Sequence, residues 1–170
     1  NSVVRTSADI DEVNLAQLMR ISSVELNVTR VSLQLRHAIL ARNPQEREAS
    51  LNDIAEKRRL IGDALKDYEK QGITAEERRL FATFPPLVAE FWRHGEANIA
   101  LIKADNKDEA FAYLVDKTIP ARNALLQGTA AAIKQEQQDV HSGVASIGSS
   151  LQSVLNFLTL STLGVLIGLI

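Results

Sequence analysis

Two arginines, Arg30 and Arg36, are the residues whose type and spacing most clearly suit a chemical role in this sequence. Guanidinium presents planar, bidentate donors and stays charged at any physiological pH, so arginine suits carboxylate recognition. On an α-helix the two would lie about 9 Å apart along the axis. Fixed positive charges beside an apolar seam between two copies repel each other unless an anion or a local carboxylate neutralises them. The pair predicts an anion site, unless both are solvated arginines whose stems pack on apolar neighbours.

The helix that must carry these arginines has two apolar stripes. The first stripe has the three- and four-residue steps of an amphipathic helix and comprises Ile21, Val24, Val28, Val31, Leu35 and Ala38. The second stripe repeats every seven residues and comprises Met19, Leu26, Leu33 and Leu40. At about 100° per residue the two stripes lie nearly opposite each other, and the two arginines flank the second one. One small bundle needs only one such face, so the second stripe predicts a homodimer through this helix.

The composition excludes several classes of function. A chain of 170 residues with 45% hydrophobic content suits one domain with an adequate core, and a net charge of −2 argues against nucleic-acid binding. The absence of cysteine excludes thiol catalysis and zinc fingers. Glu90 and His94 have the i,i+4 spacing of metal ligands, but no matching pair on another helix completes a site. We therefore expect no metal, no cofactor and no enzymatic activity.

The scarcity of proline and glycine predicts long helices. The caps, glycine signals and prolines place four of them, at about residues 7–43, 44–71, 74–104 and from 107 onward, with a kink at Pro85-Pro86. The connections are short, and short connections join antiparallel neighbours. We expect an all-α, antiparallel up-down-up-down four-helix bundle.

The fourth of these helices runs toward a membrane in our interpretation. Its apolar face is expected through Ile119, Leu126, Ala130, Ile133 and onward from Val140, with Gln137 as a polar member. From Leu155 to Ile170 the chain reads LNFLTLSTLGVLIGLI, which is shorter than the roughly 20 residues that cross a bilayer. We interpret 155–170 as the start of a second transmembrane helix, and 1–154 as an extracytoplasmic domain preceded by another transmembrane helix. The alternative for 155–170 is a buried core helix.

This pattern resembles a known family. With VELNVTRVSLQLRHAILARNP in the first helix and DEAFAYLVDKTIPARNALL in the fourth, it resembles the sensor domain of bacterial methyl-accepting chemotaxis receptors. The resemblance implies a homodimer in the bacterial inner membrane, with this portion periplasmic and ligand-binding arginines at the dimer interface. Arg36 matches the last of three arginines in the aspartate receptors. Asn27 and Ser32 occupy the other two positions, so aspartate is not the default ligand.

The fourth helix should complete the pocket. Thr118 and Pro120 match, in kind, a segment with proline and threonine in these receptors. Pro120 cannot donate to the carbonyl of Asp116, which would leave polar groups available to a ligand. Tyr113 and Arg122 are the remaining candidate pocket residues, and an ordinary proline kink is the alternative.

We therefore expect a chemoreceptor sensor domain that binds a small organic, aromatic or amino acid carboxylate at the dimer interface. Binding would displace a helix and transmit the displacement across the membrane. Two alternatives remain open. One is a sensor-kinase input module, or a bundle that senses through a partner protein without a small ligand of its own. The other is a purely structural, membrane-anchored bundle.

Overall fold

The computed structural model describes residues 2–70, 75–138 and 141. Their regular elements are α1 (Ser2–Leu40), α2 (Pro44–Lys70), α3 (Ala75–Phe81), α4 (Phe84–Lys103), α5 (Lys107–Tyr113) and the π-helical turn η1 (Leu114–Thr118). Residues 119–138 continue from η1 as helix. We call α5, η1 and residues 119–138 together the last helix.

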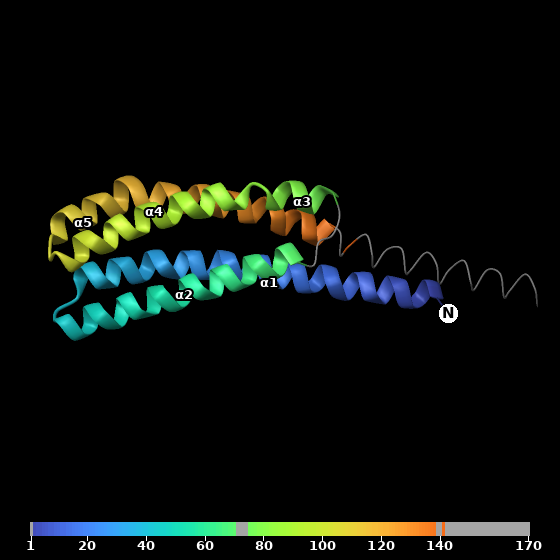
Figure 1. Ribbon diagram of the computed structural model, residues 1–170, viewed down its shortest axis with the longest axis horizontal. Helices are drawn as coiled ribbons and strands as arrows, with labels where there is room; N and C mark the ends of the chain where they lie inside the picture. Colours follow the sequence, from blue (N-terminus) through green and yellow to red (C-terminus); the bar gives the residue numbers. More distant parts are fainter. Residues whose placement is uncertain (1, 71–74, 139–140, 142–170) are drawn as a thin grey trace, which may run out of the picture.

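These elements form the expected four-helix bundle (Figure 1). One pair consists of α1 and α2, which pack closely against each other, and the other consists of α4 with the last helix. α3 continues the line of α4 at the end nearest the start of α1 (Figure 1). α1 also contacts α4, α5 and η1, so it packs against both members of the other pair. The all-α, antiparallel architecture predicted from short connections is confirmed.

The first stripe of α1 forms the centre of the core. Each of its six side chains is at most 1% exposed. Larger side chains from the other helices pack against it, among them Ile61 and Tyr68 of α2 and Phe84 and Phe91 of α4. Small branched residues on α1 and large aromatic residues opposite it fill the same space, as close packing requires.

The paired prolines break a helix where a kink was expected. α3 ends at Phe81 and α4 begins at Phe84, so Pro85 and Pro86 lie in the first turn of a new helix. The first N–H groups of a helix have no intrahelical acceptor, so proline costs nothing there, whereas its ring would clash inside a continuous helix. Thr83 donates its hydroxyl to the Leu80 carbonyl at 2.7 Å and closes the turn. The single kinked helix predicted for 74–104 is therefore wrong.

The predicted apolar face of the last helix is also displaced. Ala130 and Gln137 are exposed, and the other predicted members within the described residues are only partly buried. The wholly buried positions lie one residue earlier and include Leu125, Thr129 and Glu136. The prediction was based on large apolar side chains, so it did not identify the buried threonine and glutamate. η1 lies before all of these positions and changes the helical phase only between α5 and residues 119–138, because the Ile119 N–H bonds to the carbonyl of Leu114 five residues back.

None of the helices within residues 2–70 and 75–138 is both long enough and apolar enough to cross a membrane. The transmembrane segment expected at 155–170, and the apolar face expected beyond Val140, lie outside the described residues.

Candidate functional site

The second stripe of α1 is exposed along its whole length. Its four side chains, Met19, Leu26, Leu33 and Leu40, are 49–66% exposed, and Leu15 extends the row by one further turn. The opposite-face arrangement predicted for the two stripes is confirmed. Large apolar side chains in water at helical spacing are typical of surfaces that bind a partner helix.

Arg30 and Arg36 flank this row on opposite sides. His37 and Leu40 line a surface hollow together with Glu46 and Ala49 of α2, so the His37 side of α1 faces α2. Arg30 lies seven residues before His37, on the same side. Arg36 lies on the other flank, toward the last helix, which also packs on α1.

Both arginines are exposed, and neither makes an ion pair or a side-chain hydrogen bond with another residue in the described part of the chain. Within one protomer they do not converge on a common point, since they lie on different sides of α1. A site that used both would need a second copy of the helix.

Thr118 and Tyr113 meet at His94 of α4, inside the protomer. The Thr118 hydroxyl is fully buried and donates to the His94 carbonyl at 3.4 Å. The Tyr113 hydroxyl lies 2.9 Å from His94 Nδ1. The π-helical turn η1, which ends two residues before Pro120, positions Thr118 against α4. These two predicted pocket residues thus join the last helix to α4, and the structure does not bring them to Arg36.

His94 also lies beside a charged pair on its own helix. Its Nε2 is 3.0 Å from Oε1 of Glu90, and Arg93 donates to both oxygens of the same carboxylate. The Arg93 hydrogen bond, followed by that of His94, lowers the pKa of Glu90 to about 2. This carboxylate is ionised at neutral pH. Within the described ranges, no three histidine or carboxylate side chains gather in a way that could hold a metal ion.

The remaining predicted residue, Arg122, makes a local contact. It is half-buried and donates to the side-chain oxygen of the adjacent Asn123 at 2.8 Å. It lies on the last helix after Pro120, further from the α4–α5 turn than the residues around His94.

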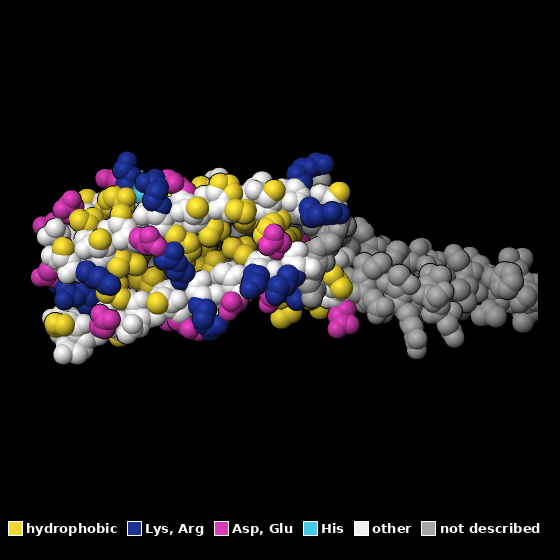
Figure 2. All heavy atoms as spheres, in the orientation of Figure 1, with side chains coloured by type: hydrophobic (Ala, Val, Ile, Leu, Met, Phe, Trp, Pro, Cys, Tyr) yellow, Lys and Arg dark blue, Asp and Glu magenta, His cyan; other side chains and the backbone are white. Residues whose placement is uncertain are grey.

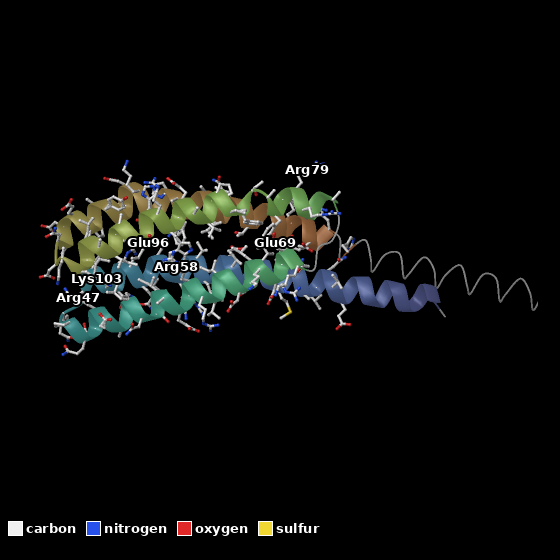
Figure 3. All side chains as sticks on the ribbon, viewed as in Figure 1. Arg47, Arg58, Glu69, Arg79, Glu96 and Lys103 are labelled. Atoms are coloured by element: carbon white, nitrogen blue, oxygen red, sulfur yellow. The ribbon has the colours of Figure 1, made fainter. Side chains whose placement is uncertain are left out.

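A polar contact between α2 and α4 was not predicted from the sequence. Apolar side chains fill the space between these helices in Figure 2, and Arg58 crosses it (Figure 3). Arg58 bonds Glu96 at 2.6 Å, and its guanidinium lies 4.8 Å from the centroid of the Trp92 ring. The signal was visible, because Arg58 occupies a heptad position of α2 that an apolar residue would normally fill.

A buried polar cluster was also missed. The Gln17 side-chain nitrogen donates to the Tyr68 carbonyl at 3.0 Å, and the Tyr68 hydroxyl donates to the Glu136 carboxylate at 2.7 Å. All three side chains are almost fully buried, and they join α1, α2 and the last helix. Nothing in the residue pattern distinguishes Glu136 from its exposed neighbours, so only the packing reveals it.

The comparisons with known proteins agree with this architecture. A family model described as a four helix bundle sensory module for signal transduction matches residues 1–146. A comparison with curated proteins finds no match. The matched family is a sensory module and not a catalytic domain. The chain therefore belongs to the four-helix-bundle sensory modules for signal transduction, the sensor modules of methyl-accepting chemotaxis proteins.

Proposed function

We propose that this chain is the periplasmic sensor domain of an inner-membrane chemoreceptor, and that it binds a small carboxylate between two copies of α1. The observation that carries the proposal is the second stripe, an apolar row that its own bundle leaves exposed. Burying that row in a homodimer removes apolar surface from water and brings the flanking arginines near a partner.

The spacing of the second stripe suits a parallel pair of helices. If the four residues of this stripe are assigned to the a positions of a heptad, the d positions are Leu15, Ser22, Thr29 and Arg36. In a parallel two-stranded pair each d residue faces its own symmetry mate. Arg36 would thus face the partner's Arg36. Dimerisation removes water from around the two guanidinium groups, and like charges repel more strongly with less water between them. A carboxylate with one oxygen for each guanidinium removes that repulsion.

Arg30 has a different neighbour in the same arrangement. It occupies an e position, and Glu25, five residues earlier, occupies the preceding g position. In parallel pairs, g and e residues of the two helices lie side by side. The partner's Glu25 then neutralises Arg30, while Arg36 has no such acid and carries the main contact with the ligand.

Signal transmission follows from the contacts of the last helix. This helix packs on α1 and is held to α4 at His94 by Tyr113 and Thr118. A ligand that binds more tightly to one relative position of α1 and the last helix shifts the population toward that position. Residues 155–170 continue the chain beyond the last helix, and a displacement would pass through them into the membrane.

Calorimetry on the full chain in detergent tests the proposal, with succinate, benzoate and L-aspartate as probes. We expect saturable binding of at least one probe below millimolar concentration, and its loss in Arg36→Ala with the helical content unchanged. Arg59→Ala is the matched control, because Arg59 is an exposed arginine of α2 that forms ion pairs with Glu56 and Asp63 on its own helix. Binding that survives Arg36→Ala contradicts the proposal. No binding of any probe favours sensing through a partner protein instead.

A further inference from the structure

Two exposed apolar side chains lie outside α1. Phe111 on α5 is 47% exposed and Val115 on η1 is 45% exposed. Among the large hydrophobic side chains that the structure describes, the other exposed ones all belong to the second stripe or to Leu15 beside it. Phe111 and Val115 are four residues apart, so they form one short apolar strip on the last helix.

This strip lies on the α1 side of the last helix. Tyr113 points to α4, where its hydroxyl meets His94. Phe111 and Val115 lie two residues before and after Tyr113, about 200° around the helix from it. Ala110 and Leu114 are fully buried and face the core. Since α1 also packs on α5 and η1, the strip lies beside α1, next to the flank that carries Arg36.

The strip is also level with Arg36 along the bundle axis. Lys107, at the start of α5, donates its ammonium to the Ala41 carbonyl at the end of α1, at 3.0 Å. A cavity of about 200 Å³ is lined by Ala38 from α1 and by Ala110 from α5, so these two residues lie near each other along the bundle axis. Because the two helices run antiparallel, Phe111 lies at about the level of residue 37 and Val115 at about the level of residue 33. Arg36 lies between those two levels.

We infer that the carboxylate bound at Arg36 carries an apolar body, as in an aromatic or branched aliphatic monocarboxylate, and that Phe111 and Val115 are its specificity-determining contacts. The inference rests on the function proposed above. One carboxylate group occupies the space between the two Arg36 guanidinium groups, and the rest of the molecule then meets the strip and the adjacent Leu33 and Leu40 of the second stripe. An apolar ligand body binds favourably to apolar side chains, because binding removes the surfaces of both the ligand and the side chains from water.

A second carboxylate on the ligand would lie in unfavourable surroundings. It would lie against Phe111 and Val115, which offer no hydrogen-bond donor, and burial of an unpaired charge is unfavourable. Asp108, exposed one turn before Phe111, adds a like charge at the same end of the strip. Lys107, the adjacent cation, already donates to Ala41. The site therefore discriminates against dicarboxylates.

Calorimetry with benzoate and succinate on the full chain in detergent tests the inference. We expect benzoate to bind about tenfold more tightly than succinate. Phe111→Ala should weaken benzoate binding about tenfold and succinate binding less than twofold, and Val115→Ala should act in the same direction with a smaller effect. Phe111→Leu keeps an apolar surface and should retain most of the benzoate affinity. Circular dichroism checks that each variant folds.

Leu26→Ala is the matched control, because Leu26 is equally exposed on the second stripe but about 15 Å from Arg36 along α1. It should leave the ratio of benzoate to succinate affinity unchanged. Tighter binding of succinate than benzoate, or equal weakening of both by Phe111→Ala, overturns the inference while leaving the proposed function intact. If Arg36→Ala alters neither ligand, the proposed function fails as well.

Discussion

The two faces of α1 are built from the same kinds of residue and have opposite surroundings. The first stripe is at most 1% exposed, whereas the second is 49–66% exposed. Valine, isoleucine and leucine on one face, and leucine and methionine on the other, have similar tendencies to leave water. The difference teaches that one face is buried by its own chain, whereas the other is left in water by it, which is why we propose a second molecule there. Because both stripes lie on one helix, a movement of this helix in the core also moves the exposed stripe.

The largest effect that separates the two faces is expected from truncating the first stripe. Leu35→Ala should lower the free energy of unfolding by about 2–5 kcal/mol, because it leaves a cavity in a closely packed core. Leu33→Ala, two residues away on the second stripe, should change it by less than about 0.5 kcal/mol under conditions where the chain is monomeric. Urea unfolding followed by circular dichroism measures both. Similar losses in the two variants would mean that the faces do not differ in this way.

A somewhat smaller effect is expected at the polar end of the buried face, where Gln17 of α1 meets Tyr68. Tyr68→Phe removes the hydroxyl that donates to Glu136 and should lower the free energy of unfolding by about 1–3 kcal/mol, since a buried carboxylate loses a donor. The control is Tyr113→Phe, which removes a hydroxyl from a less buried tyrosine. In urea unfolding, a smaller loss for Tyr68→Phe than for this control would contradict the prediction.

Substitutions in the second stripe should weaken dimerisation without changing the folding of the single chain. Leu26→Ala removes apolar area from both copies of a dimer, at about 1 kcal/mol each, so the dimer dissociation constant should rise about 30-fold. Sedimentation equilibrium in detergent measures the constant, with the exposed Ala100→Ser change on α4 as a control that should leave it unchanged. An unaltered constant in Leu26→Ala would place the dimer interface elsewhere.

The charges that flank the second stripe should contribute less. Arg30→Glu should raise the dimer dissociation constant about three- to fivefold, because it places two acids side by side in a parallel pair. Adding Glu25→Arg in the same chain restores opposite charges and should recover the original constant. Sedimentation equilibrium at low and high salt distinguishes this from packing, since only an electrostatic effect weakens with salt. Failure of the double variant to recover would argue against a parallel arrangement.

The smallest effect is expected at an exposed group that belongs to neither face. The pKa of Glu90 is lowered from its ordinary 4.5 to about 2 by Arg93 and then His94. A lowered pKa in the folded state stabilises the fold above pH 4.5, and this contribution is lost as the pH falls from 4.5 toward 2. Glu90 is exposed, so screening by solvent keeps this contribution to the free energy of unfolding small. Arg93→Ala should return the pKa toward its ordinary value in an NMR titration, and an unchanged pKa would show that Arg93 is not the cause.

The residue pattern predicted α1 well and the last helix poorly, for one physical reason. On α1, apolar side chains recur at helical spacing on both faces, so periodicity identifies the faces directly. On the last helix, buried positions carry polar side chains. Thr118 and Glu136 bond to groups on α4 and α2, whereas Thr129 donates to the Leu126 carbonyl of its own helix. The phase change at η1 depends on the Ile119–Leu114 hydrogen bond, which no side-chain pattern encodes. Periodicity reports a preference for leaving water, and it cannot report a polar group whose partner is distant in sequence.

The candidate site divides in the same way. The exposed Arg36 and the apolar row beside it follow from the sequence alone, because charge and helical spacing are local properties. That Tyr113 and Thr118 turn toward His94, and that Phe111 and Val115 lie level with Arg36, was decided only by the tertiary structure. The height and rotation of one helix against another depend on how whole side-chain layers interlock, and contacts between Lys107 and Ala41 or between Thr118 and His94 exist only once the helices have packed.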